Sequence, residues 1–440
     1  MTAQEVSYQT SKENDEIEIS INPNYFFTNF SFQVGGWWKV YYEPSTFYII
    51  DDIPPFLKIT FNFTNDPMAF HLEVFSGKEY MALRKWPNTS FFYIPNAPHI
   101  SLDMRFPYTS YLSFDLGDQR ITLGRNKVKW GCWRYPVALS GRFPYLDNFS
   151  YSARFKYLSY SFIIASINPV LSKDEWKVQS SIRPVNADPL SPYNEKSKNL
   201  VAHKLSIHPS DSLEISVGEL TMVGGKSLDL FSLDPLAILH NNFNEGYTNS
   251  MLDTSLSWTF FKGWSYYFEI ALDDIAIPLT ERADIKPTAY GLTTGIVKTF
   301  DLLGNHGYIE MSYTKTSKWM YNTFLPYLKF NARYVFLSNY PVGSRVIVDY
   351  PLGFEYGPDA QMFSLYANFS EDPEVESEIA ILIKGPATIE TEYKSDIPKD
   401  TKTYIMYTLR ISFKSSVNIL LRIINDKYFI GGWWKISKVF

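Results

Sequence analysis

The chain has 440 residues, of which 45% are hydrophobic and 17% aromatic, and its mean hydropathy is -0.17, so apolar and polar side chains are interleaved at short range, as in β-strands. The net charge of -5 gives no basic field, which excludes nucleic acid as the main partner. No apolar run reaches the roughly 18 residues that a membrane-spanning helix requires.

The first 19 residues are polar. They lack the basic segment followed by an apolar core that marks a secretory signal peptide, so we expect no signal peptide within them. A mature chain whose leader had been removed would show the same pattern.

Alternation with a period of two recurs along the chain. In residues 57–64 (LKITFNFT), four apolar side chains alternate with four polar ones. Residues 249–261 (NSMLDTSLSWTFF) place Trp258 on an apolar face, and residues 264–274 (WSYYFEIALDD) place Glu269 on a polar face. The same pattern recurs in SLEISVG, GYIEMSYT, MFSLYANFS, ESEIAILIK and TYIMYTLRISF. We find no comparable stretch with helical periodicity.

These alternating segments have the length of strands that cross a bilayer at a tilt, about 9 to 11 residues. A soluble β-sandwich also alternates, but here the apolar faces are rich in Phe, Tyr and Trp, as aromatic girdles require. The opposite faces carry charged and hydroxyl side chains, as a wet lumen allows. We therefore predict an all-β fold, with residues 1–440 forming a single transmembrane antiparallel β-barrel of about 14–18 strands. We predict that the barrel lies in the bacterial outer membrane, surrounded by lipid.

Residues 79–149 break the alternation. They contain many prolines, one tight hairpin (LSFDLGDQRITLG), and a basic stretch with no acidic residue from Ile121 to Leu146. A barrel too wide to be filled by its own wall can take such a segment into its lumen. We predict that residues 79–149 fold inward as a plug or constriction, with Arg120 to Arg142 inside the lumen or at its mouth.

Basic and aromatic side chains of this segment form the candidate ligand site. Cations pair with carboxylates and indole rings stack on sugar rings, so the cluster suits an acidic polysaccharide or a smaller anion. Charge balance within the lumen and packing inside a plug stay open as alternatives. The candidate residues are Arg120, Arg125, Lys127, Lys129, Trp130, Trp133, Arg134 and Arg142.

Two long polar connections, residues 168–199 and 224–249, are rich in Pro, Asn and Ser. Surface loops on the outer side of an outer-membrane barrel have this character. We therefore expect these loops to meet a ligand or a neighbouring molecule.

No catalytic or metal chemistry is expected. The single cysteine, Cys132, excludes an intrachain disulfide framework. The chain has no GxSxG motif, and adjacent carboxylates such as Asp273 and Asp274 face opposite sides of a strand, so they cannot flank one bond. The six histidines, which form no metal-ligand spacing, are His71, His99, His203, His208, His240 and His306. We predict that the protein is not an enzyme and binds no cofactor.

Residues 115–151 (DLGDQRITLGRNKVKWGCWRYPVALSGRFPYLDNFSY) resemble the signature of Wzi-type capsule-assembly outer-membrane proteins. The segments SLDPLAILHNNF, NSMLDTSLSW and FEIALDD are similar to downstream parts of such proteins. The resemblance implies a barrel that organises or anchors surface polysaccharide and is not an enzyme. The residues that carry it are Gly124, Arg125, Trp130, Gly131, Leu139, Ser140 and Pro144.

Two other functions stay open on the sequence alone. One is a general or anion-leaning diffusion porin, and the other is an outer-membrane hydrolase, which would need a pair of facing acidic side chains in the lumen. The sequence specifies neither the glycan nor the oligomeric state.

The pentapeptide GGWWK occurs at Gly35–Lys39 and again at Gly431–Lys435. In a closed sheet the first and last strands must pair. The chain also ends on Phe440, an aromatic terminus of the kind that outer-membrane barrels share. We predict that both copies lie on the strands that close the barrel, with Trp434 facing lipid and Lys435 facing the lumen.

Overall fold

The structure, a computed structural model, describes residues 16–22, 24–28, 32–34, 55, 57–76, 79–81, 100–102, 107–181, 195–228, 234, 248–274, 287–302, 305–339, 342–414, 416–425 and 427–440. These residues form a 21-stranded sheet and a 4-stranded sheet. None of the described helices is long and apolar enough to cross a membrane.

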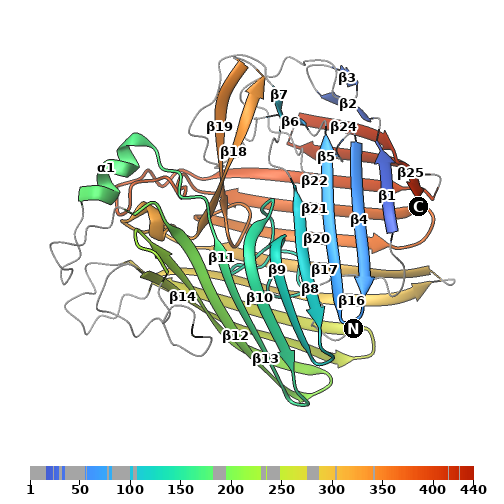
Figure 1. The fold of residues 1–440 in the computed structure, drawn as a ribbon, viewed down its shortest axis with the longest axis horizontal. Helices are drawn as coiled ribbons and strands as arrows, with labels where there is room; N and C mark the ends of the chain where they lie inside the picture. Colours follow the sequence, from blue (N-terminus) through green and yellow to red (C-terminus); the bar gives the residue numbers. More distant parts are fainter. Residues whose placement is uncertain are drawn as a thin grey trace.

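The large sheet is the wall (Figure 1). Its strands are β1 (Glu16–Ile21), β2 (Asn24–Thr28), β3 (Phe32–Val34), β4 (Leu57–Asn65), β5 (Met68–Ser76), β8 (Thr109–Asp115), β9 (Gln119–Asn126), β10 (Leu146–Arg154), β11 (Leu158–Ser166), β12 (Lys198–Ser210), β13 (Leu213–Gly224), β14 (Thr248–Phe261), β15 (Trp264–Asp274), β16 (Ala289–Leu302), β17 (Asn305–Thr316), β20 (Ala360–Phe369), β21 (Glu374–Lys384), β22 (Lys402–Ser412), β23 (Val417–Ile424), β24 (Lys427–Trp434) and β25 (Ile436–Val439). The small sheet and the helices are β6 (Glu79–Met81), β7 (Ile100–Leu102), β18 (Asn331–Asn339), β19 (Val342–Pro351), α1 (Lys173–Ser181) and η4 (Pro326–Leu328).

The wall is antiparallel and closes on itself, because β1 pairs with β4 on one side and with β25 on the other. β1 and β2 keep one register against β25 and β24, with Ile21 opposite Ile436 and Asn24 opposite Trp433. β1 and β2 therefore follow one another at a single position in the wall, and so do β24 and β25. The 21 described strands of the large sheet thus count as 19. β3 lies in line with β4, so the described circuit has 18 positions. The predicted antiparallel barrel is confirmed, at the upper end of the predicted size.

The two ends of the barrel differ. One end carries tight connections such as residues 116–118, 155–157 and 211–212, together with the C-terminus. The other end carries long connections, including residues 167–197, which contain α1, and residues 317–359, which contain β18 and β19. In Figure 1 α1 lies at the left and the C-terminus at the right. Outer-membrane barrels have short periplasmic turns and long outer loops, and we name the two ends the short-turn end and the long-loop end.

Outward and inward positions follow the predicted alternation. On β14, Leu252 and Trp258 are 44% and 46% exposed, whereas Asp253 between them is fully buried. On β15, Glu269 is fully buried and faces the interior. The exposed apolar face is the one that lipid covers, and the polar face lines the lumen.

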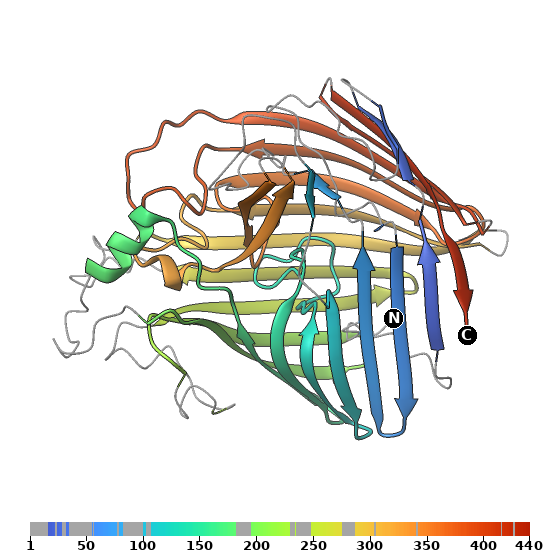
Figure 2. The ribbon, with the colours of Figure 1, turned by 45° about the horizontal axis from the view of Figure 1, so that its top comes forward.

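An apolar core lies in the long-loop half of the lumen. Inward side chains of the wall there, such as Leu200, Leu220 and Met251, are fully buried. They pack against residues 127–145, which we call the inner segment, and against residues 317–359. Figure 2 shows the inner segment, the teal trace after β9, coiled within the ring of strands.

The prediction that residues 79–149 form one inward segment is too wide. β8 and β9 form the predicted tight hairpin, but β8 pairs with β5 and β9 pairs with β10, so both are wall strands. Among the described residues of this range, the inner segment between β9 and β10 enters the lumen, and β6 and β7 belong to the small sheet. The hairpin alternates like the other wall strands, and its short length hid this among the prolines around it.

Part of one predicted loop is helical. Residues 168–199 were expected to be irregular, but α1 occupies residues 173–181. Isolated helices of this length are marginal in water, so contacts with the rest of the protein must stabilise it.

The closing strands partly test the prediction about GGWWK. The C-terminal copy lies at the end of β24, which pairs with β2 and continues into β25, the partner of β1. Trp434 is 45% exposed, and Lys435 pairs with inward-facing Glu18 at 2.5 Å, as the predicted faces require. The N-terminal copy, residues 35–39, lies outside the described residues.

The closing register predicts a disulfide. Ile17 and Phe440 exchange backbone hydrogen bonds, which makes Ser20 and Ser437, three positions along, a non-hydrogen-bonded pair. Such pairs have Cα atoms about 4.5 Å apart, within disulfide range. In a Cys132→Ser background, Ser20→Cys with Ser437→Cys should therefore crosslink on mild oxidation, measured as a loss of free thiols. Ile19→Cys with Ser437→Cys, whose side chains face opposite sides, should not. Crosslinking of the second pair alone would contradict this register.

Candidate ligand-binding chamber

The inner segment is held to the wall by Glu269. This carboxylate accepts hydrogen bonds from the Trp133 indole at 2.6 Å and from the backbone N–H groups of Val137 and Ala138 at 3.0 and 3.1 Å. The Trp133 ring also stacks on Tyr267, with ring centroids 5.3 Å apart. One buried wall carboxylate thus satisfies three donors of the inner segment.

A second wall carboxylate, Glu378 on β21, holds the same segment from another direction. Arg134 donates two hydrogen bonds to it, at 2.9 and 3.1 Å, and the Tyr135 hydroxyl donates a third at 2.5 Å. The Arg134 guanidinium also lies 3.9 Å from the centre of the Tyr366 ring. Arg134 is therefore engaged by the wall.

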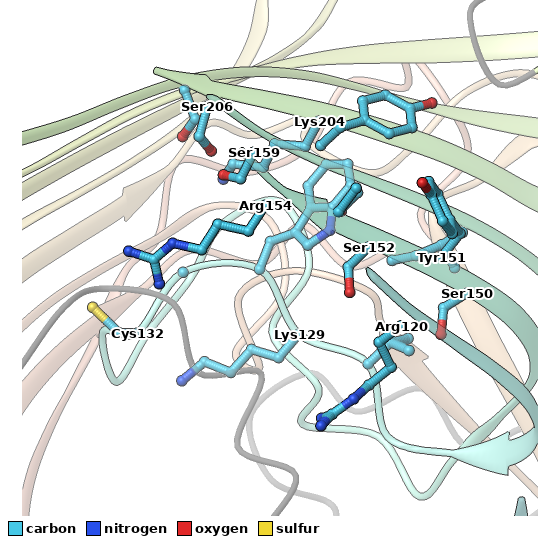
Figure 3. Close-up of a pocket in the computed structure, with 18 of the residues that line it drawn as sticks. Arg120, Lys129, Cys132, Ser150, Tyr151, Ser152, Arg154, Ser159, Lys204 and Ser206 are labelled. Atoms are coloured by element: carbon cyan, nitrogen blue, oxygen red, sulfur yellow. The ribbon is translucent and has the colours of Figure 1, made fainter. Parts of the chain in front are cut away.

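A cavity of about 940 Å³ lies between the inner segment and the wall strands β9 to β14 (Figure 3). We call it the chamber. Its wall is rich in hydroxyl groups that alternate along successive strands. The serines that line it from the wall are Ser150, Ser152, Ser159, Ser161, Ser206, Ser216, Ser255 and Ser257.

Cations reach the chamber from both the wall and the inner segment. Arg120 pairs with Asp115 at 2.6 Å, and Lys204 pairs with Asp253 at 3.1 Å. For Lys129 and Arg154 the part of the chain that the structure describes supplies no ion-pair partner. Figure 3 shows Arg120, Lys129 and Arg154 extending into one space.

The surroundings of Lys129, on the inner segment, favour an added negative charge. Burial, and then the nearby charge of Arg142, lower the pKa of Lys129. A bound anion would oppose both effects. The indole N–H of Trp130, which is 5% exposed and lines the chamber, has no hydrogen-bond partner among the described residues. A ligand acceptor could satisfy it.

The structure brings five of the eight predicted site residues to the chamber and places three elsewhere. Arg125 shares the outer face of β9 with exposed Leu123 and pairs with Asp147 at 2.7 Å. Arg134 is engaged by Glu378, and Arg142 is exposed, with its guanidinium 6.0 Å from the Tyr135 ring centre. The residues that line the chamber are Arg120, Lys127, Lys129, Trp130 and Trp133.

Sequence reasoning missed Arg154 and the serines. A signal for the serines was present, because Ser150 and Ser152, Ser159 and Ser161, and Ser255 and Ser257 are each spaced by two, the last pair on a predicted strand. Side chains at that spacing share a face. Nothing in the sequence indicated that these faces adjoin one chamber.

No group of three or more His, Cys, Asp and Glu side chains in the described ranges is arranged to hold a metal ion. Cys132 lines the chamber, and its side chain is exposed to it.

The comparisons with known proteins identify a fold class. No family model and no curated protein matches the chain. The solved structure of Escherichia coli Wzi, described as an outer-membrane protein involved in group 1 capsule assembly and as a carbohydrate-binding β-barrel, matches with a TM-score of 0.57 at 13% identity, covering 96% of this chain and 84% of that one. Pseudomonas aeruginosa OccK10 (OpdN) matches with a TM-score of 0.45 at 6% identity, over 97% and 99% of the two chains. P. aeruginosa OpdQ matches with a TM-score of 0.43 at 10% identity, over 97% of each. At these identities the likeness concerns the fold, and the protein is a bacterial outer-membrane β-barrel.

Proposed function

We propose that this protein is a non-conducting outer-membrane barrel that holds acidic, capsular-type polysaccharide in its chamber. The observation that carries the proposal is the composition of the chamber. Eight serine hydroxyls, two indole rings and the cations Lys129 and Arg154 surround one cavity.

Each of these groups matches a part of an acidic sugar. Serine hydroxyls donate to and accept from sugar hydroxyls, the Trp130 indole N–H, unpartnered among the described residues, can donate to another, and cations pair with uronic-acid carboxylates. Ligand cavities range from about 300 to 1,000 Å³, so the chamber has room for a short oligosaccharide segment. The description of Wzi as carbohydrate-binding supports this choice of ligand class.

The core in the long-loop half supports a barrel that does not conduct. Leu200, Leu220 and Met251 are fully buried against the inner segment and its neighbours, and a water-filled channel would leave such side chains wet. The proposed role of the inner segment is therefore that of a plug.

A diffusion porin is the second candidate, because the chamber itself is polar and lies along the wall. Planar-bilayer recordings separate the two functions. The proposal predicts no steady ion conductance, whereas stable channels in the unmodified protein would favour the porin. We do not propose a hydrolase. The acidic residues that line the chamber are Asp115, Asp118 and Glu214, and Asp115 is already paired with Arg120.

The chamber cations give a direct test of the ligand. We expect Lys129→Gln with Arg154→Gln to weaken binding of an acidic polysaccharide by about tenfold or more, because a hydrogen bond to a charged group contributes about 1.5 to 3 kcal/mol. Binding of a neutral polysaccharide should change little. Isothermal titration of the detergent-purified barrel with hyaluronan and with dextran as probes measures both.

Lys298→Gln is the matched control, because this lysine lies on another wall strand with its Nζ 5.0 Å from the Trp264 ring centre. It should leave both affinities unchanged. Equal loss of both affinities in the double variant would mean that the cations support the fold and do not read the charge of the ligand.

A further inference from the structure

The chamber lies in the short-turn half of the barrel. Gly117 and Asp118, which line it, belong to the turn between β8 and β9. Ser159 and Glu214 line it within two residues of the turns at 155–157 and 211–212. The cavity therefore reaches the rim at the short-turn end.

Along β12, β13 and β14 the lining changes from polar to apolar toward the long-loop end. On β13 the inward positions run from Glu214 and Ser216, which line the chamber, to Leu220 and Met222, which are fully buried. On β12 and β14 the inward residues change in the same way, from Lys204 to Leu200 and from Ser255 to Met251. All three strands pass from chamber to core.

The boundary is tightly packed. A Cβ atom on Gly218 would lie 3.0 Å from the Trp130 ring, and one on Gly291 would lie 2.9 Å from Val137 Cβ. Farther along β13, a Cβ on Gly224 would lie 2.5 Å from Tyr327 Cβ. At these three positions the wall backbone therefore touches the inner segment and residues 317–359 directly, which leaves no width there for a sugar ring.

We infer that the chamber is loaded only from the short-turn end. In outer-membrane barrels that end faces the periplasm. The identity of the ligand as a glycan rests on the proposed function, but the direction of access does not. If the ligand is a glycan, it is supplied by a process that delivers polymer into the periplasm, and capture from the cell exterior is excluded.

Cys132 makes the inference testable, because it is the only cysteine of the chain and its side chain is exposed to the chamber. The reagent is a hydrophilic maleimide on a slim polyethylene glycol chain, too large to pass through general porins. In intact cells expressing the full barrel, Cys132 should stay unlabelled. After permeabilisation of the outer membrane, and in detergent, it should be labelled.

Two control variants in a Cys132→Ser background calibrate the two sides. Asp400→Cys, at an exposed position between β21 and β22, should be labelled in intact cells, and Asp211→Cys, in an exposed short turn, only after permeabilisation. Labelling of Cys132 in intact cells at the rate of Asp400→Cys overturns the inference. So does a Cys132 that reacts only in denaturant, because the chamber would then be closed to the short-turn end as well. Neither result depends on a glycan. The labelling experiment therefore tests the direction of access independently of whether the proposed function is correct.

Discussion

Replacing Glu269 with alanine is expected to release the inner segment from the wall. The carboxylate is fully buried and accepts three hydrogen bonds, from the Trp133 indole and from two backbone N–H groups. A buried donor left without an acceptor costs about 1 to 3 kcal/mol, so three such donors outweigh most single interactions in the lumen. On gels, a folded barrel changes its mobility when heat unfolds it, and we expect this change at a lower midpoint temperature in the variant. We also expect the variant to conduct ions in planar bilayers.

Two variants make this test specific. Glu269→Gln keeps one carbonyl acceptor at the same volume and should lose less stability. Glu214→Ala removes another inward carboxylate, which forms no hydrogen bond among the described residues, and should stay non-conducting with a nearly unchanged midpoint. If Glu269→Ala is no less stable than Glu214→Ala and conducts no ions, the inner segment is held by its apolar packing and by Glu378, without need of Glu269.

The wall was predictable from the sequence because its cause is local. Trp258 and Glu269 were assigned to the faces on which the structure has them, since neighbouring residues on a strand must point to opposite sides. The closing pair of strands followed from topology, because a closed sheet has to join its ends.

The contents of the lumen were only partly predictable because their causes are distant in sequence. Glu269 and its partner Trp133 are 136 residues apart, and Glu378 and Arg134 are 244 apart. A run of basic residues shows that charge is present but not which partner neutralises each one. Arg125 and Lys129 therefore looked alike in the sequence, although one is paired outside the chamber and the other lines it.

α1 shows the same limit. Ser172 and Glu175 form a capping box, with Ser172 Oγ accepting from the Glu175 N–H at 3.1 Å and Glu175 accepting from the Ser172 N–H at 3.0 Å. That spacing was a local signal for a helix start and was missed. What holds the helix in place was not in the local sequence, because its main partner is Arg333 on β18.

Replacing Glu175 with alanine is expected to detach α1. Arg333, which is 3% exposed, donates two hydrogen bonds to Glu175, at 2.7 and 2.8 Å, and one to Asp349 at 3.0 Å. Leaving a buried charge unpaired costs about 3 to 5 kcal/mol. Because Arg333 keeps its pair with Asp349, we expect a loss below that range. Limited proteolysis within residues 173–181, together with the heat-shift midpoint, measures the loss. Asp174→Ala is the control on the same helix, because among the described residues the exposed Asp174 pairs only with Lys177, and its effect should be far smaller.

The pH dependence identifies the ion pair as the cause. Burial by itself would raise the pKa of Glu175, but its hydrogen bonds and ion pair with Arg333 outweigh burial and leave the pKa below its ordinary value. A carboxyl group with a depressed pKa contributes stability that is complete above its unfolded pKa, about 4.3, and is lost as the pH falls through the folded pKa. The difference in midpoint between the unmodified protein and Glu175→Gln should therefore be constant above pH ~5 and shrink in more acidic buffer. A difference that persists unchanged at low pH would show that the ion pair with Arg333 is not its cause, since protonation of Glu175 removes that ion pair.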